Sequence, residues 1–171
     1  APTWRTVVGI FKLRIGVLIM LTALAGAAFS TAPAPAAWKV ALMALCVLAS
    51  SAAAGAFNQF IEADSDRLMK RTQGRAFATG TLKAGPFWLG IILVLLAAAV
   101  AATAWFINVT AAVFLFLGAF TYAVVYTVVL KRRTWWNIVF GGAAGSFAVL
   151  TGAAAADPSI GALPALFALV L

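Results

Sequence analysis

The sequence predicts an all-α, polytopic bundle of transmembrane helices. Its 171 residues are 65% hydrophobic and only 9% charged, and the mean hydropathy is +1.08. Apolar runs of about 20 residues recur along the chain, which is the length that an α-helix needs to cross a hydrocarbon core of about 30 Å. The runs show no two-residue alternation, so they indicate helices rather than the strands of a barrel.

Five full spans are expected, followed by the beginning of a sixth. All six tryptophans lie near the ends of the apolar runs, and indole rings favour the membrane interface. A minimal turn at Asn108 separates the third run from the fourth, and Asp157 and Pro158 form a turn after the fifth. We therefore expect spans over residues 15–37, 40–61, 86–107, 109–130 and 137–156, with a sixth that begins near Ile160.

Basic residues are distributed unevenly between the loops. Of the 12 lysines and arginines, only Lys39 lies on the side opposite to all the others. Because positively charged loops stay in the cytoplasm, the N-terminus, the loop after the second span and the cluster of Lys131, Arg132 and Arg133 are expected there. The net charge of +8 then reflects membrane topology, and a surface for nucleic acid is disfavoured.

Two residue types that often bind metals are scarce or absent in this sequence. Cys46 is the single cysteine and lies in the middle of a span, which excludes disulfides and thiolate metal sites within the chain. Histidine does not occur, which excludes imidazole ligation of a metal or haem by this chain and histidine-based acid–base catalysis. The candidates for chemistry are therefore carboxylates, amides and basic groups.

Charge is concentrated between Asn58 and Arg75, where the second span ends. This segment, NQFIEADSDRLMKRTQGR, holds three of the four carboxylates in the chain. In a helix that continues out of the span, Asn58, Glu62 and Asp66 follow at four-residue intervals and share one face, whereas Asp64 points elsewhere. Mg²⁺ would join such acids, because it binds one or two carboxylates, keeps waters and takes further ligands from phosphates.

A simpler interpretation is that Asp66 pairs with Lys70 and that the other charges only solvate the end of a helix. Asn58 and Glu62 argue against it, because they extend the polar stripe into the apolar span. An ionisable group at such a depth costs roughly 2.5 to 3.5 kcal/mol on insertion scales. The pattern therefore favours a functional site over a solvated helix end.

Arg71 and Arg75 are also four residues apart. A guanidinium group can hold phosphate oxygens with two parallel hydrogen bonds, so these arginines suit a diphosphate group next to the carboxylates. A long apolar tail on that diphosphate would lie among the Ala- and Gly-rich helices. The alternative, that the basic residues only form a cytoplasmic loop, stays open for each of them.

These residues resemble the first aspartate-rich motif of the UbiA-type intramembrane prenyltransferases, most closely the haem O synthase (protoheme IX farnesyltransferase) branch. The stretch YTVVLKRRTWWNIVFGGAAG resembles a second segment of that branch, and Lys12-Leu13-Arg14 is a weaker third match. Ala76 and Trp135 replace family prolines, which affects loop shape rather than charge. The first motif is matched by Asn58, Glu62, Asp64, Asp66, Met69, Arg71, Thr72 and Arg75.

The resemblance implies an enzyme that transfers a farnesyl group from farnesyl diphosphate to haem B, with Mg²⁺ assisting the departure of diphosphate. It implies a bacterial inner membrane protein in contact with lipid, with respiratory oxidase assembly proteins as further partners. Glu62 and Asp66 would be the catalytic residues, and Asn58 would join them as a metal ligand. The residues expected to bind the diphosphate are Lys70, Arg71, Arg75 and Lys131, with Arg14 and Tyr126 as second candidates.

Two of these assignments have alternatives. Lys131 is also a cation at a helix C-terminus, where the helix dipole and the topology favour positive charge. Tyr126 also suits an aromatic belt at the membrane interface. Both residues are retained as candidates for the diphosphate site.

The length of the chain bears on how much of such an enzyme it contains. The family is expected to have nine spans and a second acidic motif between the sixth and seventh. Residues 1–171 are therefore expected to form a single prenyltransferase-like domain that corresponds to the N-terminal part and is incomplete at the C-terminus, so activity of this chain alone is doubtful. Three other interpretations stay open: an aromatic quinone precursor as acceptor, a transporter, and a non-catalytic membrane subunit.

Overall fold

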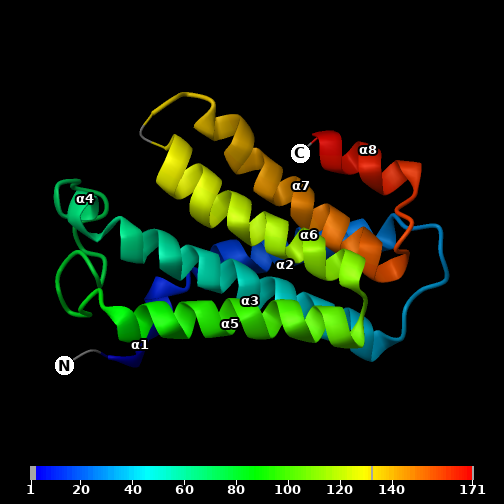
Figure 1. Cartoon of the computed structure of the whole chain (residues 1–171), viewed down its shortest axis with the longest axis horizontal. Helices are drawn as coiled ribbons and strands as arrows, with labels where there is room; N and C mark the ends of the chain where they lie inside the picture. The colour runs from blue at the N-terminus through cyan, green and yellow to red at the C-terminus, as the bar shows by residue number, and fades with distance from the viewer. Residues whose placement is uncertain (1–2, 132, 171) are drawn as a thin grey trace.

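The computed structural model describes residues 3–131 and 133–170, and every regular element among them is a helix (Figure 1). Arg132 of the predicted basic cluster lies outside the described residues. The helices are α1 (Trp4–Ile10), α2 (Leu13–Ala28), α3 (Ala37–Ile61), α4 (Ala63–Arg67), α5 (Pro86–Phe106), α6 (Val109–Phe120), the π-helix η1 (Thr121–Leu130), α7 (Asn137–Ala156) and α8 (Ala162–Val170).

The helices of the central bundle are long and apolar enough to cross a membrane. Four qualify on length and hydropathy: α3, α5, α7 and the continuous pair of α6 and η1, with 20 to 25 residues each. A fifth span results if α1 and α2, which meet at an angle of 45°, are taken together. The prediction of a polytopic membrane helix bundle is confirmed, and its first span is the bent one.

The predicted extent of the first span is wrong at its C-terminal end. Residues 15–37 were expected to be helical, but α2 ends at Ala28 and α3 begins at Ala37. Pro33 and Pro35 lie between them. Proline lacks the N–H that a helix interior requires and disfavours helical geometry in the residue before it, so the segment before α3 is not helical.

The fourth span also departs from a regular α-helix. Its second half, η1, is wound as a π-helix, in which the backbone N–H bonds the carbonyl five residues earlier. The pattern continues at its end, where the Lys131 N–H donates to the Tyr126 carbonyl at 2.9 Å. The Thr127 hydroxyl donates to the Tyr122 carbonyl at 2.8 Å, which anchors this side chain to the same helix.

Small residues let α2 and α7 approach closely. A Cβ at Gly152 would lie 1.7 Å from the Ala23 carbonyl oxygen, and one at Gly26 would lie 2.2 Å from the Val149 carbonyl oxygen. Each glycine therefore allows the backbone of the other helix to pack directly against its own. In lipid the hydrophobic effect does not drive helices together, so close contacts of this kind between small residues are a main source of stability.

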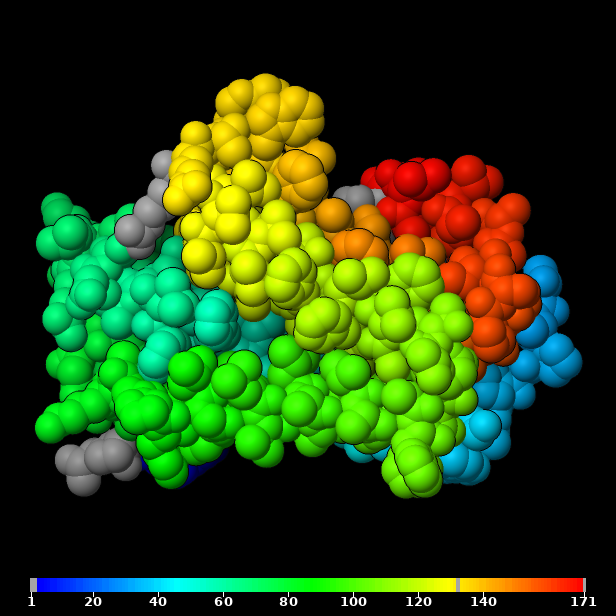
Figure 2. Space-filling view, viewed as in Figure 1, coloured from blue at the N-terminus to red at the C-terminus, as the bar shows by residue number. Residues whose placement is uncertain are grey.

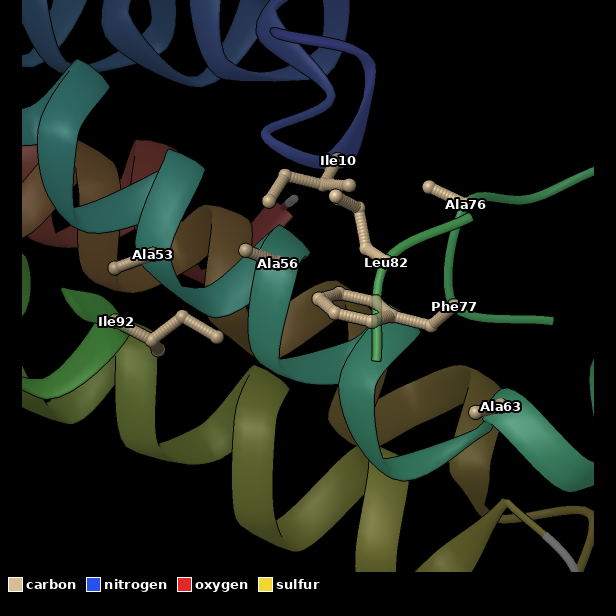
Figure 3. Packing of buried hydrophobic residues seen from close by; sticks show 8 residues of the cluster. All are labelled: Ile10, Ala53, Ala56, Ala63, Ala76, Phe77, Leu82 and Ile92. Atoms are coloured by element: carbon tan, nitrogen blue, oxygen red, sulfur yellow. The ribbon is translucent and has the colours of Figure 1, made fainter. Parts of the chain in front are cut away.

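The loop between α4 and α5 folds back over the end of α3. Figure 3 shows Phe77 and Leu82 of this loop, with Ile10 from the end of α1, packed around Ala56 on α3. Phe77 is 1% exposed, and its ring meets that of Phe60 edge-on with centroids 5.7 Å apart. This apolar cluster fixes the loop that carries Arg75.

The segments richest in basic residues lie at one end of the bundle. In Figure 1, α1, α4 with its following loop, and the link from η1 to α7 share one end, and the links before α3 and between α7 and α8 lie at the other. Figure 2 shows one face of the molecule, with the helices packed side by side along it. Many large apolar side chains of the bundle are exposed, such as Val94 at 68% and Trp105 at 85% exposure. An apolar exterior of this kind suits contact with lipid.

We expect Gly152→Ala to destabilise the bundle, because the added methyl group collides with backbone rather than with a movable side chain. Overpacking of this kind typically costs about 1–3 kcal/mol. Cys46 is buried, so a thiol-reactive fluorophore measures the unfolding temperature of the purified protein. Gly145→Ala, in the same helix but with nothing within 4 Å of its added methyl group, is the control. Equal unfolding temperatures for the two variants would contradict the close contact.

Candidate functional site

Three polar residues are buried together at the end of α3. Asn58, Glu62 and Asp66 are 2%, 4% and 3% exposed, although the surrounding helix is apolar. The Asn58 side-chain amide donates to Glu62 Oε2 at 3.0 Å and to the Thr127 hydroxyl on η1 at 3.1 Å. Asn58 therefore connects the carboxylate of its own helix to the fourth span.

The single helix predicted to carry these three residues is interrupted. α3 ends at Ile61, and Glu62 has φ −89° and ψ 4°, outside the regular helical range. The helical hydrogen-bond spacing nevertheless continues across the break, because the Glu62 N–H donates to the Asn58 carbonyl and the Asp66 N–H to the Glu62 carbonyl. Asn58, Glu62 and Asp66 consequently stay on one side of the chain despite the break.

Two cations from distant parts of the chain meet the buried carboxylates. Lys131, directly after η1, donates to both oxygens of Glu62 at 2.5 and 2.7 Å. Arg75 donates from Nη1 to Asp66 Oδ2 at 2.7 Å, and the same nitrogen lies 3.9 Å from Glu62 Oε2. Buried carboxylates are stable only when such partners compensate their lost hydration.

The remaining charged candidates lie on the surface. Asp66 pairs with Arg75 rather than with Lys70, the partner considered in the simpler interpretation. Lys70, Arg71 and Arg14 are exposed, and none of them pairs with a carboxylate among the described residues. Asp64 is exposed and pairs with Arg67 at 3.4 Å rather than with a cation of the cluster.

Lys12 is the residue of this site that the sequence did not single out for a role. It lies in the turn between α1 and α2, with φ +47° and ψ 44°, and its Nζ donates to Asn58 Oδ1 at 2.6 Å. The short match at Lys12-Leu13-Arg14 was the available signal, but it gave no indication that Lys12 meets Asn58.

Gln59 bonds the backbone next to Lys12, and Tyr126 lies beside Lys131. The Gln59 side-chain amide donates to the Gly9 and Ile10 carbonyls at 3.3 and 3.1 Å, which fastens the end of α1 to α3 just before Lys12. The ring of Tyr126 stacks on that of Tyr122 with centroids 5.5 Å apart. The Nζ of Lys131 lies 5.9 Å from the centre of the Tyr126 ring, within the range of a cation–π contact.

A cavity of about 250 Å³ extends from this site into the bundle. Lys12 and Tyr122 line it beside the cluster, and Val47, Leu115 and Ala148 are among the residues that line it deeper between the helices. Most of its wall is apolar and formed by small residues. The charged cluster therefore lies beside an apolar chamber rather than in an isolated polar pocket.

The oxygen donors of the cluster fit a hard divalent cation. Glu62 and Asp66 face the same Arg75 nitrogen, whereas the Asn58 amide oxygen accepts from Lys12 and its nitrogen faces Glu62. Within residues 3–131 and 133–170, no group of three or more acidic, histidine or cysteine side chains is placed to hold a metal. Two carboxylates suit Mg²⁺, which keeps several waters and shares its ligands with substrate phosphates.

The family model described as UbiA prenyltransferase family matches residues 19–171. The chain belongs to this family. That membership confirms the predicted resemblance, and it agrees with a helix bundle whose polar cluster adjoins an apolar cavity. No solved structure matches the chain.

Several similar proteins share the name protoheme IX farnesyltransferase. The chain is 52% identical to protoheme IX farnesyltransferase 2 of Paramagnetospirillum magneticum, over 98% of this chain and 58% of that protein. It is 46% identical to protoheme IX farnesyltransferase 1 of the same organism, over 99% and 59%. For protoheme IX farnesyltransferase 2 of Natronomonas pharaonis the identity is 42%, over 95% and 37%. The chain thus spans well under two thirds of the length of these relatives.

We expect a double-mutant cycle to find strong coupling between Glu62 and Lys131. Glu62→Gln, Lys131→Met and the double variant should give a coupling of about 1–3 kcal/mol in the free energy of unfolding, because each single change leaves one charge without its partner, the buried Glu62 or the partly buried Lys131. Denaturation of the purified protein in mixed micelles measures it.

The matched control is the exposed pair Asp64 and Arg67, tested with Asp64→Asn, Arg67→Met and their double variant. Its coupling should be close to zero, since water screens an exposed ion pair. Equal coupling in the two cycles would show that Lys131 and Glu62 do not form a buried pair.

Proposed function

We propose that this chain is part of an intramembrane prenyltransferase that transfers a farnesyl group from farnesyl diphosphate to haem B. The observation that carries the proposal is the buried cluster in which Glu62 and Asp66 face Lys131 and Arg75 beside an apolar cavity. The names of the similar proteins supply the donor and acceptor, since protoheme IX is haem B. The UbiA family domain supports prenyl transfer as the reaction class.

In this proposal the chain binds the diphosphate by charge. Arg75 and Lys131 donate hydrogen bonds to its oxygens, and Arg71 and Lys70 on the adjoining loop add positive charge at the surface. Arg14 at the start of α2 is the most distant candidate. These donors stabilise negative charge that grows on the oxygen as the bond to the farnesyl carbon breaks, which is the main way such sites lower a barrier.

Asn58, Glu62 and Asp66 are the residues that would hold Mg²⁺. When bound, the metal would neutralise the departing diphosphate. The carboxylates also hold Lys131 and Arg75 in the cluster when no anion is present, so that the donors are already in position.

The apolar cavity suits the hydrocarbon part of the donor. The electron pair of the broken carbon–oxygen bond leaves with diphosphate, and the allylic cation that remains adds to a vinyl group of haem B. Water then supplies a hydroxyl group and releases a proton, which gives a hydroxyethylfarnesyl side chain. Tyr122 and Tyr126 lie near the start of this path, where aromatic faces stabilise positive charge.

The chain is an integral membrane protein, and we place it in the bacterial inner membrane with the cluster on the cytoplasmic side. The grouping of α1, α4 and the η1–α7 link at one end, where the basic residues concentrate, supports this orientation (Figure 1). In this proposal residues 1–171 act as one domain. Respiratory oxidase assembly proteins are proposed as further partners.

We expect cysteine labelling to place the two ends of the bundle on opposite sides of the membrane. In a Cys46→Ala background, Lys83→Cys should react with a membrane-impermeant maleimide only after the cells are permeabilised. Ser159→Cys, in the exposed turn before α8, should react in intact spheroplasts. The reverse pattern of labelling would overturn the orientation.

The substrate proposal is tested first by binding. Labelled farnesyl diphosphate should bind the purified chain more tightly with Mg²⁺ than without, and Arg75→Gln should weaken binding by about 100-fold, as for the loss of a key anion donor. Lys83→Gln removes a charge from the same loop without touching the cluster and should have no effect. Binding that is insensitive to both Mg²⁺ and Arg75 would contradict the proposed site.

Transfer is then measured in membranes that contain the full-length protein, supplied with labelled farnesyl diphosphate, Mg²⁺ and either haem B or an aromatic acid. Haem B should become labelled, and Asp66→Ala should reduce the rate by at least about 100-fold because a metal ligand and the partner of Arg75 are lost. Full activity in Asp66→Ala would sink the mechanism. Labelling of an aromatic acid in place of haem would instead assign the chain to the quinone-precursor branch.

A further inference from the structure

A second polar hollow lies on the other side of Lys12 from the apolar cavity. It is a groove of about 600 Å³ between α1, the end of α3 and the loop after α4. None of the described residues that line it is acidic, although three of them are cations. The polar and small residues that matter to its chemistry are Arg5, Thr6, Lys12, Gln59, Gly74 and Arg75.

The groove has a fixed frame. Gln59 bonds the carbonyls at the end of α1, and Ile10 is 1% exposed in the cluster that also contains Ala76 from the opposite wall (Figure 3). Both walls are therefore held by the same buried packing. A cation set on such a frame keeps its position better than one on a free loop.

The walls leave room for a ligand to approach the backbone. An added Cβ would meet nothing within 4 Å at Gly9 or at Gly74, so both glycines face open space. Arg5 projects from the first turn of α1 and is exposed, and it pairs with no carboxylate among the described residues. Its recorded neighbour is the Trp4 ring, at 5.9 Å from the guanidinium carbon.

Two residues connect the groove to the rest of the site. Lys12 lines both the groove and the apolar cavity, and it bonds Asn58 between them. Arg75 lines the groove and also contacts Asp66. The groove is consequently adjacent to the carboxylate cluster, but Arg5 and Thr6 belong to the groove alone.

We infer that this groove is a second anion site, which binds a phosphate or diphosphate group outside the cluster of Asn58, Glu62 and Asp66. Arg75 is already paired with Asp66, but Arg5 pairs with no carboxylate among the described residues and Lys12 bonds the neutral Asn58, so these two cations leave the groove positive. Positive charge of this kind attracts anions, and arginine matches phosphate oxygens with paired donors. Trp4 is 71% exposed beside Arg5, which suits the membrane interface, where phosphate groups are concentrated. The inference goes beyond the proposed prenyl transfer and requires no prenyl substrate.

The phosphate has two possible sources, a free diphosphate in solution and the headgroup of an anionic lipid. Inorganic diphosphate is therefore titrated calorimetrically, without Mg²⁺, into the chain in nanodiscs of neutral phosphatidylcholine. Arg5→Gln should weaken binding about fivefold, whereas Lys83→Gln, an exposed cation outside the groove, should leave it unchanged. Arg5 is exposed, so its replacement does not threaten folding.

A third variant distinguishes anion binding in the groove from anion binding at the cluster of Asn58, Glu62 and Asp66. Lys131→Gln removes a donor of the cluster but none of the groove, so the fivefold effect of Arg5→Gln should persist in the Lys131→Gln background. Equal binding by the Arg5→Gln and parent chains would overturn the inference, as would equal weakening by Arg5→Gln and Lys83→Gln. Neither result depends on whether farnesyl transfer occurs.

The same titration in nanodiscs containing one-third phosphatidylglycerol identifies the source. If the Arg5→Gln effect persists, the groove prefers the free anion. If the effect disappears because lipid phosphate already fills the groove, the anionic lipid is the preferred occupant. Both outcomes support a phosphate site.

Discussion

The buried carboxylate of Glu62 needs a cation beside it to compensate the hydration that it loses at the end of an apolar helix. That electrostatic constraint governs the arrangement of the surrounding chain. Lys131, 69 residues later in the sequence, reaches both of its oxygens. Arg75 returns from the following loop to Asp66 and approaches Glu62 as well. The fourth span and the loop after α4 are thereby tied to α3 at one point.

The apolar packing serves this arrangement. Phe77 and Leu82 bury the loop against α3 (Figure 3), so that Arg75 is held over the carboxylates instead of extending into solvent. At the other side, the close contact of α2 with α7 through Gly26 and Gly152 brings the helices around the cavity together. Loss of either contact would loosen the site without removing any of its charged groups.

Much of the fold could be predicted from the sequence because lipid imposes simple rules. Apolar runs of spanning length locate the helices, and four-residue spacing brings Asn58, Glu62 and Asp66 to one side. The end of the first span was also open to prediction from Pro33 and Pro35, whose effect on the backbone outweighs the hydropathy of the run around them.

Other features of the site depend on contacts that no local pattern encodes. The choice of Arg75 over Lys70 as the partner of Asp66 follows from the packing of a whole loop. The contact of Lys12 with Asn58 requires a left-handed turn in a non-glycine residue, which the sequence does not signal. For both contacts the sequence shows which chemical groups are present but not how they are arranged in space.

The π-winding of η1 makes the chain sensitive to insertions and deletions at this point. Each residue of an α-helix turns the chain by about 100°, and each residue of the wider π-helix turns it by somewhat less, so removal of one residue between Thr121 and Leu130 with the π-winding retained would rotate Lys131 by roughly a quarter turn around the helix axis. Its ammonium group would leave Glu62, although every side chain of the cluster would still be present. The length and the winding of this helix together therefore set the position of Lys131, whereas an exposed loop tolerates changes in length.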